Sequence, residues 1–217
     1  IRINGNGMLM YGRCNSYIVT NGTVDCHFSN LVLDAYPSDV VAAGVLIDTF
    51  TLRCTLENIR HRGSTNANHV GFIIIGESIT TWDLFASDCL GAGPGMTVSD
   101  CVESDFYNTT LYNNSFGLKV TADGAANFDP SESVRFWGGA IYGNVGDGIE
   151  LDNGTRDVLF SGISVRFHAA AAGCRILATQ GNVTRCRFVG CSFNGNLNGV
   201  QDIAGSTRIV LESCDIS

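Results

Sequence analysis

Three carboxylates occur close together in the stretch 147–152 of this chain. Glu150 and Asp152 are two residues apart in a segment that alternates apolar and polar side chains. Alternate residues of a strand point to one face, so these two side chains are expected about 6.5–7 Å apart at the backbone. Two carboxyl groups at such a spacing suit glycoside hydrolysis, with a neighbouring cation keeping one of them ionised. The sequence therefore predicts Glu150 and Asp152 as an acid/base pair, with Asp147 or Asp129 beside them.

The same carboxylates also fit a purely structural interpretation. If equivalent positions of neighbouring repeats stack, Glu150 falls between Lys119 and Arg175. Charges of opposite sign on adjacent strands form a surface ladder without any catalytic role. We favour the ladder and keep the catalytic pair as the alternative.

Aromatic residues recur at two other outward positions. Tyr107 and Trp137 are expected on adjacent coils, and so are Tyr112 and Tyr142. Exposed aromatic rings with polar neighbours bind sugar rings, and they equally well fill a contact with a second subunit. The predicted substrate-binding residues are Tyr107, Trp137, Tyr112, Tyr142, Arg135 and Arg166.

An internal repeat of about 26 residues positions all of these side chains. One motif is a glycine followed by an apolar residue, any residue and another mostly apolar one; it starts at Gly44, Gly71, Gly95, Gly117, Gly148, Gly173 and Gly199. A second motif has a large apolar anchor and runs in phase with it; the anchors are Phe28, Leu56, Trp82, Phe106, Phe136, Phe160, Phe188 and Leu211. A repeat of this length predicts a solenoid before any local assignment is made.

Each repeat contains two or three short runs with the alternation of β-strands. Such a unit cannot bury its apolar face alone, but it can when the next unit stacks on it in parallel. The chain is therefore predicted to be all-β, a right-handed single-stranded parallel β-helix of about eight coils. A propeller blade needs about 40 residues, a leucine-rich repeat needs a consensus that is absent here, and a sandwich does not explain the phased glycine motif.

The repeat phase also predicts which side chains point outward. The glycine motif gives Leu46, Ile73, Thr97, Lys119, Glu150, Arg175 and Gln201. The anchor motif gives two columns: Ser29, Glu57, Asp83, Tyr107, Trp137, Ser161, Val189 and Glu212, and then Asp34, Arg62, Asp88, Tyr112, Tyr142, Arg166 and Asn194. The apolar run Phe72–Ile75 is expected to be buried on both faces, which predicts a subunit contact at the early coils.

Polar and sulfur-containing residues fit the same phase. Asn114, Asn144 and Asn196 are expected to form a ladder at one turn. His168 is expected at a surface turn. Cysteines are predicted as buried free thiols, in the columns Cys26 with Cys54 and Cys191 with Cys214, and Cys174 is inward. Free thiols are consistent with folding in a reducing cytosol.

Composition narrows the function classes. The net charge is −8 and only 16% of residues are charged. No basic cluster is present to neutralise phosphates, so nucleic acid is not an expected partner. No apolar run is long enough to span a membrane. Residues 1–217 are predicted to be one domain with an irregular first coil over 1–22, and the chain is expected to be a piece of a longer protein. No metal and no cofactor are predicted.

The coils NNSFGLKV, GNVGDGIEL and NGNLNGVQDI resemble those of right-handed β-helices of the pectate-lyase type. They resemble in particular bacteriophage tailspikes and polysaccharide depolymerases. The resemblance implies a homotrimer of parallel β-helices that binds or cleaves bacterial surface polysaccharide, in the virion tail or outside the cell. It implies folding in the bacterial cytosol as well, which the free thiols suit. It also implies Asp/Glu pairs as catalytic groups, although no calcium-binding Asp cluster with a catalytic Arg matches.

Two hypotheses from different classes follow. The first is a tailspike-like β-helix that binds bacterial polysaccharide, with glycoside hydrolase and polysaccharide lyase both open as its chemistry. The second is a non-catalytic structural segment of a tail fibre or another virion or cell-surface assembly. Because this fold carries many functions, the resemblance alone does not decide between them.

Overall fold

The computed structural model describes residues 1–12, 17–35, 43–48, 51–63, 65, 69–91, 93–122, 131–168, 170–177, 182–203 and 205–217. Side chains are described in these ranges except at 7–12 and 35. The predicted positions Cys14 and Asp129, and most of the loop between Ala122 and Ser133, lie outside the described residues.

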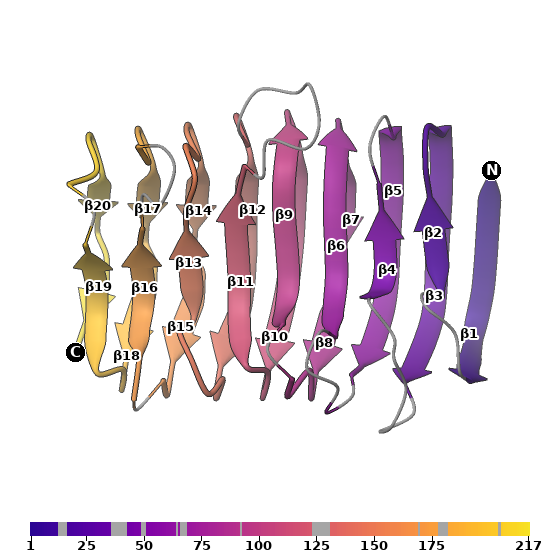
Figure 1. Cartoon of the computed structure of the whole chain (residues 1–217), viewed down its shortest axis with the longest axis horizontal. Helices are drawn as coiled ribbons and strands as arrows, with labels where there is room; N and C mark the ends of the chain where they lie inside the picture. The colour runs from indigo at the N-terminus through magenta and orange to yellow at the C-terminus, as the bar shows by residue number, and fades with distance from the viewer. Residues whose placement is uncertain are drawn as a thin grey trace.

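The chain winds into a solenoid of parallel strands that stack along one axis, with the termini at opposite ends (Figure 1). The first strand stack consists of β1 (Arg2–Gly12), β3 (Val24–Ala35), β5 (Leu52–Arg62), β7 (Thr80–Trp82), β8 (Phe85–Ser87), β10 (Asp105–Tyr112), β12 (Arg135–Tyr142), β14 (Leu159–Ser161), β15 (Ser164–Arg166), β17 (Arg187–Val189), β18 (Ser192–Asn194), β20 (Val210–Glu212) and β21 (Asp215–Ile216). The predicted all-β parallel solenoid is therefore confirmed. Its handedness stays a prediction.

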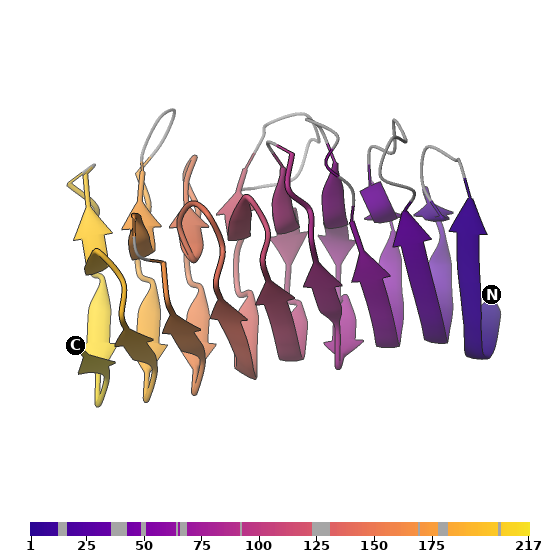
Figure 2. The same ribbon diagram turned by 90° about the horizontal axis from the view of Figure 1, so that it is seen from below.

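The second strand stack covers another face of the solenoid (Figure 2). It consists of β2 (Ile18–Thr20), β4 (Ala43–Ile47), β6 (Val70–Glu77), β9 (Pro94–Val102), β11 (Phe116–Thr121), β13 (Ile149–Leu151), β16 (Ala172–Ile176) and β19 (Asn198–Asp202). These strands are seven turns apart from first to last, close to the predicted count of about eight coils. No helix among the described residues is long and apolar enough to cross a membrane.

Left-handed backbone conformations bend each coil of the first stack into two legs. Residues with positive φ occupy the same bend in successive coils: Asn30, Asn58, Asp83, Asn108, Gly138, Gly162, Gly190 and Ser213. Asn, Asp and Gly tolerate this conformation better than other residues. The asparagine side chains also link coils, because Asn58 Nδ2 donates to Asn30 Oδ1 at 2.9 Å. Long strands such as β10 therefore present outward side chains on both sides of a corner.

Stacked apolar side chains fill the interior, as the anchor motif predicted, with one error. Phe106, Phe136, Phe160 and Phe188 form a continuous stack with ring centroids 4.7–4.9 Å apart. Trp82 was predicted to belong to this column, but Thr81 occupies it and pairs with both Leu56 and Phe106. Trp82 points outward instead and is 45% exposed.

The same one-residue shift moves two predicted outward positions. Trp82 replaces Asp83 between Glu57 and Tyr107, and Ser87 replaces Asp88 between Arg62 and Tyr112. Asp83 and Asp88 adopt positive φ at the corners. Strands β7 and β8 have only three residues each, so the two corners fix the register of this coil more strongly than the size of the side chains does. The outward column of the second stack is confirmed from Leu46 to Gln201.

Buried turns carry the predicted polar ladder, and buried positions of strands and turns carry the free thiols. Asn114 Nδ2 donates to Asn144 Oδ1 at 3.1 Å, and Asn196 Oδ1 accepts from the backbone of His168. His168 was predicted at the surface; this is wrong, because its side chain is fully buried in the asparagine column. The pairing of Cys26 with Cys54 in one column is confirmed, and the described cysteines are free.

Candidate functional site

Three outward aromatic side chains form a ridge on the first leg of the first strand stack. We call Trp82, Tyr107 and Trp137 the aromatic ridge. The rings of Trp82 and Tyr107 stack at 3.9 Å with planes 7° apart, and those of Tyr107 and Trp137 lie 6.4 Å apart and 14° from parallel. The pairing of β7, β10 and β12 in one register brings them together. Sequence analysis found Tyr107 and Trp137 but placed Trp82 in the core.

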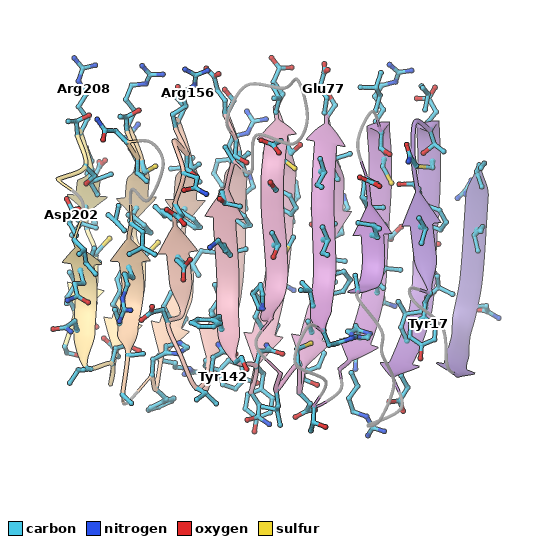
Figure 3. All side chains as sticks on the ribbon, viewed as in Figure 1. Tyr17, Glu77, Tyr142, Arg156, Asp202 and Arg208 are labelled. Atoms are coloured by element: carbon cyan, nitrogen blue, oxygen red, sulfur yellow. The ribbon has the colours of Figure 1, made fainter. Side chains whose placement is uncertain are left out.

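A second aromatic pair lies on the other leg of the same strands. Tyr112 and Tyr142 stack with centroids 4.8 Å apart. The guanidinium carbon of Arg166 lies 5.5 Å from the centre of the Tyr142 ring and 5.7 Å from that of Phe167. We call Tyr112 and Tyr142 the tyrosine pair. Arg166 is exposed, and none of the described carboxylates forms an ion pair with it, so a ligand anion can approach it. Figure 3 shows Tyr142 at the opposite edge of the solenoid from Glu77 and Arg156.

A surface depression of about 290 Å³ separates the ridge from the tyrosine pair. Its lining is Asn58, Arg60, Asp83, Leu84, Phe85, Asn108 and Thr110. Along β10, Tyr107 precedes the lining residues Asn108 and Thr110, and Tyr112 follows them. The depression is thus flanked by aromatic rings and lined by amide, hydroxyl, carboxylate and guanidinium groups, which can bind sugar hydroxyls.

The ring faces of the ridge are not all available to a ligand. Tyr107 lies between Trp82 and Trp137, so both of its faces are covered. Trp137 pairs in the next coil with Ser161, whose side chain is too short to cover an indole. At the adjacent corner, a side chain added at Gly138 or Gly162 would contact nothing within 4 Å. The free stacking surface therefore lies at the two ends of the ridge, at Trp82, which is 45% exposed, and at Trp137, which is half-buried.

Asp105 fixes the position of Trp137. Its Oδ1 accepts a hydrogen bond from Trp137 Nε1 at 2.9 Å, and its Oδ2 accepts one from Arg135 at 2.7 Å. Arg135 was predicted to bind substrate, but it is already paired with Asp105. Because these contacts hold the indole in one orientation, a sugar that stacks on Trp137 does not have to order it first.

The predicted acid/base pair lies on the second strand stack and shares one cation. Lys119 Nζ lies 2.7 Å from Glu150 Oε1 and 3.5 Å from Asp152 Oδ2. Burial opposes the charge on Lys119, but its contacts with Glu150 and Asp152 outweigh burial and raise its pKa. Asp152 is 3% exposed, and its Oδ1 accepts the backbone N–H of Asn153 at 2.8 Å. Both carboxylates are thus paired with one ammonium, which is the arrangement of a surface charge ladder.

Asp147 is also engaged by its neighbours. It is 2% exposed, and its Oδ1 accepts the backbone N–H of Ala172 at 2.8 Å. Its Oδ2 lies 3.1 Å from Arg175 Nε. The charge ladder predicted for this face is thus present, with Arg175 paired to Asp147 rather than to Glu150. We call Asp147, Glu150 and Asp152 with Lys119 and Arg175 the acidic face.

The aromatic residues and the acidic face lie on different faces of the solenoid. The ridge and the tyrosine pair stand on β7, β10 and β12, whereas Glu150 and Asp152 stand on and directly after β13. Outward side chains from two faces of one solenoid diverge. The structure therefore brings the predicted aromatic residues together with Trp82. It also brings the predicted carboxylates together, but on another face, so the two sets do not form one site.

The chain can be compared with known protein families, curated protein sequences and solved structures. No protein-family model matches the chain, and no curated protein sequence matches it. Among solved structures, it is similar to the "Azotobacter vinelandii Mannuronan C-5 epimerase AlgE6 A-module", with 13% sequence identity and a TM-score of 0.45. The match covers 90% of this chain and 74% of that chain. At this identity and TM-score, the likeness carries no argument about function.

Proposed function

We propose that this β-helix binds polysaccharide along the first strand stack, across the aromatic ridge, the depression and the tyrosine pair. The observation that carries the proposal is the depression of about 290 Å³ with polar walls between two sets of outward aromatic rings. Exposed rings supply apolar contact to the C–H faces of sugars, and the wall residues supply hydrogen bonds. We further propose a bacterial surface polysaccharide as the ligand and Arg166 as the contact for its acidic sugars.

The setting we propose is a tailspike-like protein of a virion tail or of the cell exterior, assembled as a homotrimer. Its support is the resemblance of the coil sequences to tailspike β-helices. Cleavage belongs to the same proposal as a separate step, with Glu150 and Asp152 as its candidate residues. Their pairing with Lys119 supports a structural role more than a catalytic one.

The experiment is a screen of bacterial capsular and O-antigen polysaccharides by affinity electrophoresis, with a reducing-end assay on each mixture. The proposal predicts retardation by at least one polysaccharide, which Trp137→Ala weakens about tenfold or more while Leu197→Ala leaves it unchanged. Leu197 is a matched control because it is an exposed apolar residue directly before β19 that belongs neither to the two aromatic sets nor to the lining of the depression. Retardation that Trp137→Ala does not alter would contradict the assigned face.

One observation favours a second function, that of a structural segment. Val19, Leu46 and Ile73 stack outward in three successive coils of the second strand stack. Val19 is 57% exposed, and a row of apolar side chains on a sheet face is a typical subunit contact. Light scattering after size-exclusion chromatography tests this function. A trimer that Leu46→Lys dissociates, and that no polysaccharide of the screen retards, supports the structural function over the binding function. A monomer at all concentrations contradicts the structural function.

A further inference from the structure

Three residues of the early coils differ in type from the residues at the same positions of other coils. Their side chains lie together in the interior. The first is His61 at the inward end of β5. Its column otherwise holds apolar residues, with Leu33 before it and Ala86, Leu111, Ile141, Val165 and Phe193 after it. His61 is 1% exposed. A buried imidazole at an apolar position needs a polar partner, and packing alone does not supply one.

The second departure is Cys89, which follows β8. It precedes Asn114, Asn144, His168 and Asn196 in the buried turn column, and its backbone N–H donates to Asn114 Oδ1 at 3.0 Å. In the next coils, the side chain at this position hydrogen-bonds to the backbone or to the next side chain of the column. Cys89 instead carries a fully buried thiol, which makes only a long hydrogen bond to the Ser87 carbonyl, at 3.8 Å, among the described residues.

The third departure is His69, which immediately precedes β6 and is fully buried. Its Nε2 lies 2.6 Å from Nε2 of His61, and the two ring centroids are 4.9 Å apart. The nearest ligand atoms of His61, His69 and Cys89 all lie within 4.8 Å of one another. Among the described residues, this is the one group of three such side chains close enough to share a metal ion.

A comparison with His168 shows that one ring nitrogen of His61 lacks a hydrogen-bond partner among the described residues. His168 is equally buried, but its two ring nitrogens lie 3.2 Å and 3.3 Å from the carbonyls of Gly146 and Ile141. His61 Nδ1 has no hydrogen-bond partner among the described residues. The Nε2 of His61 faces Nε2 of His69 instead of a carbonyl. Imidazole nitrogens are common metal ligands.

Two glycines make room for the cluster. A Cβ added at Gly44 would lie 2.6 Å from Nδ1 of His61, and one added at Gly63 would lie 2.5 Å from Sγ of Cys89. Both distances are far below van der Waals contact. The backbone at Gly44 and Gly63 therefore lies so close to the cluster that a residue with a Cβ atom would clash with it.

We propose that His61, His69 and Cys89 form a buried binding site for a Zn²⁺ ion, with two imidazole nitrogens and one thiolate as ligands. This combination is typical of zinc, with Zn–N of about 2.0–2.1 Å and Zn–S of about 2.3 Å. Two nitrogens on a tetrahedral zinc are roughly 3.3 Å apart by these bond lengths, so the rings must separate by less than about 1 Å. Binding forms the Zn–S bond and releases the thiol proton to solvent.

The site would tie three segments that are separate in sequence: the end of β5, the start of β6 and the turn after β8. The sequence predicted no metal, because the ligands follow no Cys-x-x-Cys or His-x₃-His spacing. Zn²⁺ that binds the folded chain and not the unfolded one stabilises it by mass action. Its expected effect is a rise in Tm on addition of Zn²⁺ and a fall after chelation.

The experiment is metal analysis of the purified full chain, followed by Co²⁺ titration of the chelator-treated protein. We expect about one Zn²⁺ per chain and, with Co²⁺, a thiolate-to-cobalt charge-transfer band together with d–d bands of tetrahedral intensity. Cys89→Ala should abolish the charge-transfer band. His61→Leu restores the apolar residue of its column, so it should fold and still lose at least tenfold in Co²⁺ affinity.

His168→Asn is the matched control, because it changes an equally buried histidine into the residue of the neighbouring turns. It should bind Co²⁺ as the parent chain does. A folded parent chain that binds neither Zn²⁺ nor Co²⁺ stoichiometrically would overturn the proposal. So would an unchanged cobalt spectrum in His61→Leu or Cys89→Ala, since the ligand set would then be wrong.

Discussion

The aromatic ridge and the acidic face both consist of outward side chains stacked on adjacent coils. They differ in how completely the neighbouring coils contact those side chains. On the acidic face, Lys119 and Arg175 from adjacent coils neutralise Glu150, Asp152 and Asp147. On the ridge, Trp137 has a stacking partner on one side and the short Ser161 on the other. In a stacked repeat, a side chain is available to a ligand only where the next coil leaves it incompletely contacted.

The largest effect should come from breaking the acidic face. Arg175→Met removes the cation beside Asp147, which is 2% exposed and, among the described residues, then keeps only its backbone hydrogen bond. Arg175 is itself half-buried, and loss of one partner of such a pair leaves an uncompensated charge, so we expect a loss of about 2 kcal/mol in the free energy of unfolding. Urea denaturation measures it.

Asp147→Asn in the same background provides the control for that prediction. It removes the orphaned charge and should recover part of the lost stability. If Arg175→Met unfolds at the same urea concentration as the parent chain, then the pairing of this face contributes nothing, and the contrast with the ridge fails.

The next effect concerns the ridge. Trp137→Ala removes the ring that has a free face and should weaken polysaccharide binding about tenfold, or about 1.4 kcal/mol. Tyr107→Ala, in which the lost ring has both faces covered, should weaken binding less. Isothermal titration with the polysaccharide found in the screen compares the two. An equal or larger loss in Tyr107→Ala would show that the stack, and not its free end, is the binding surface.

The register of the ridge shows what the sequence can and cannot establish. The 26-residue phase predicted the solenoid, the outward column from Leu46 to Gln201, and Tyr107 and Trp137 on adjacent coils. It failed at Trp82, because the large side chain was taken as the core anchor. Ile79 and Thr81 are both fully buried, so alternation from Ile79 would have placed Trp82 outside. The size of the side chain was a weaker guide than the strand period in a coil bounded by two close corners.

The buried turns show a second limit. Counting 24 residues from Asn144 reaches His168, and counting 25 back from Asn114 reaches Cys89, so the phase contained both positions. The repeat phase did not predict that His61 lies next to His69, because His61 belongs to a strand of the first stack and His69 directly precedes a strand of the second stack. The partners of Arg175 were likewise unpredictable, since Asp147 reaches it from the turn before the strand.

A smaller effect, visible only with changing pH, involves the turn that supports the acidic face. Burial lowers the pKa of His168 below its usual 6.5, and the carbonyl contacts oppose this only in part. The unfolded chain then binds a proton first, so the stability that His168 contributes is present above about pH 6.5 and is lost as pH falls toward its folded pKa. His168→Asn removes this dependence.

The measurement is the difference in urea midpoint between the parent chain and His168→Asn from pH 8 to pH 5. The difference should shift in favour of the variant as the pH falls. A difference that stays constant over this range would show that His168 keeps its ordinary pKa in the folded chain.

The smallest effect on polysaccharide binding is expected when the carboxylates of the acidic face are substituted. Glu150→Gln and Asp152→Asn lie on the other face, so polysaccharide affinity should stay within about twofold of the parent value, which is below 0.5 kcal/mol. The reducing-end assay on the same variants tests their predicted catalytic role. A strong loss of affinity in either variant would place the ligand on the acidic face and reverse the comparison.

The most direct test uses the two tryptophans of the chain, Trp82 and Trp137, because both stand on the aromatic ridge. Intrinsic fluorescence therefore reports on this ridge alone. A polysaccharide that binds there should shift the tryptophan emission to shorter wavelength and protect it from acrylamide quenching, and Trp82→Phe and Trp137→Phe should each remove part of the change. A polysaccharide that binds by titration calorimetry yet leaves both emission and quenching unchanged would contradict the account.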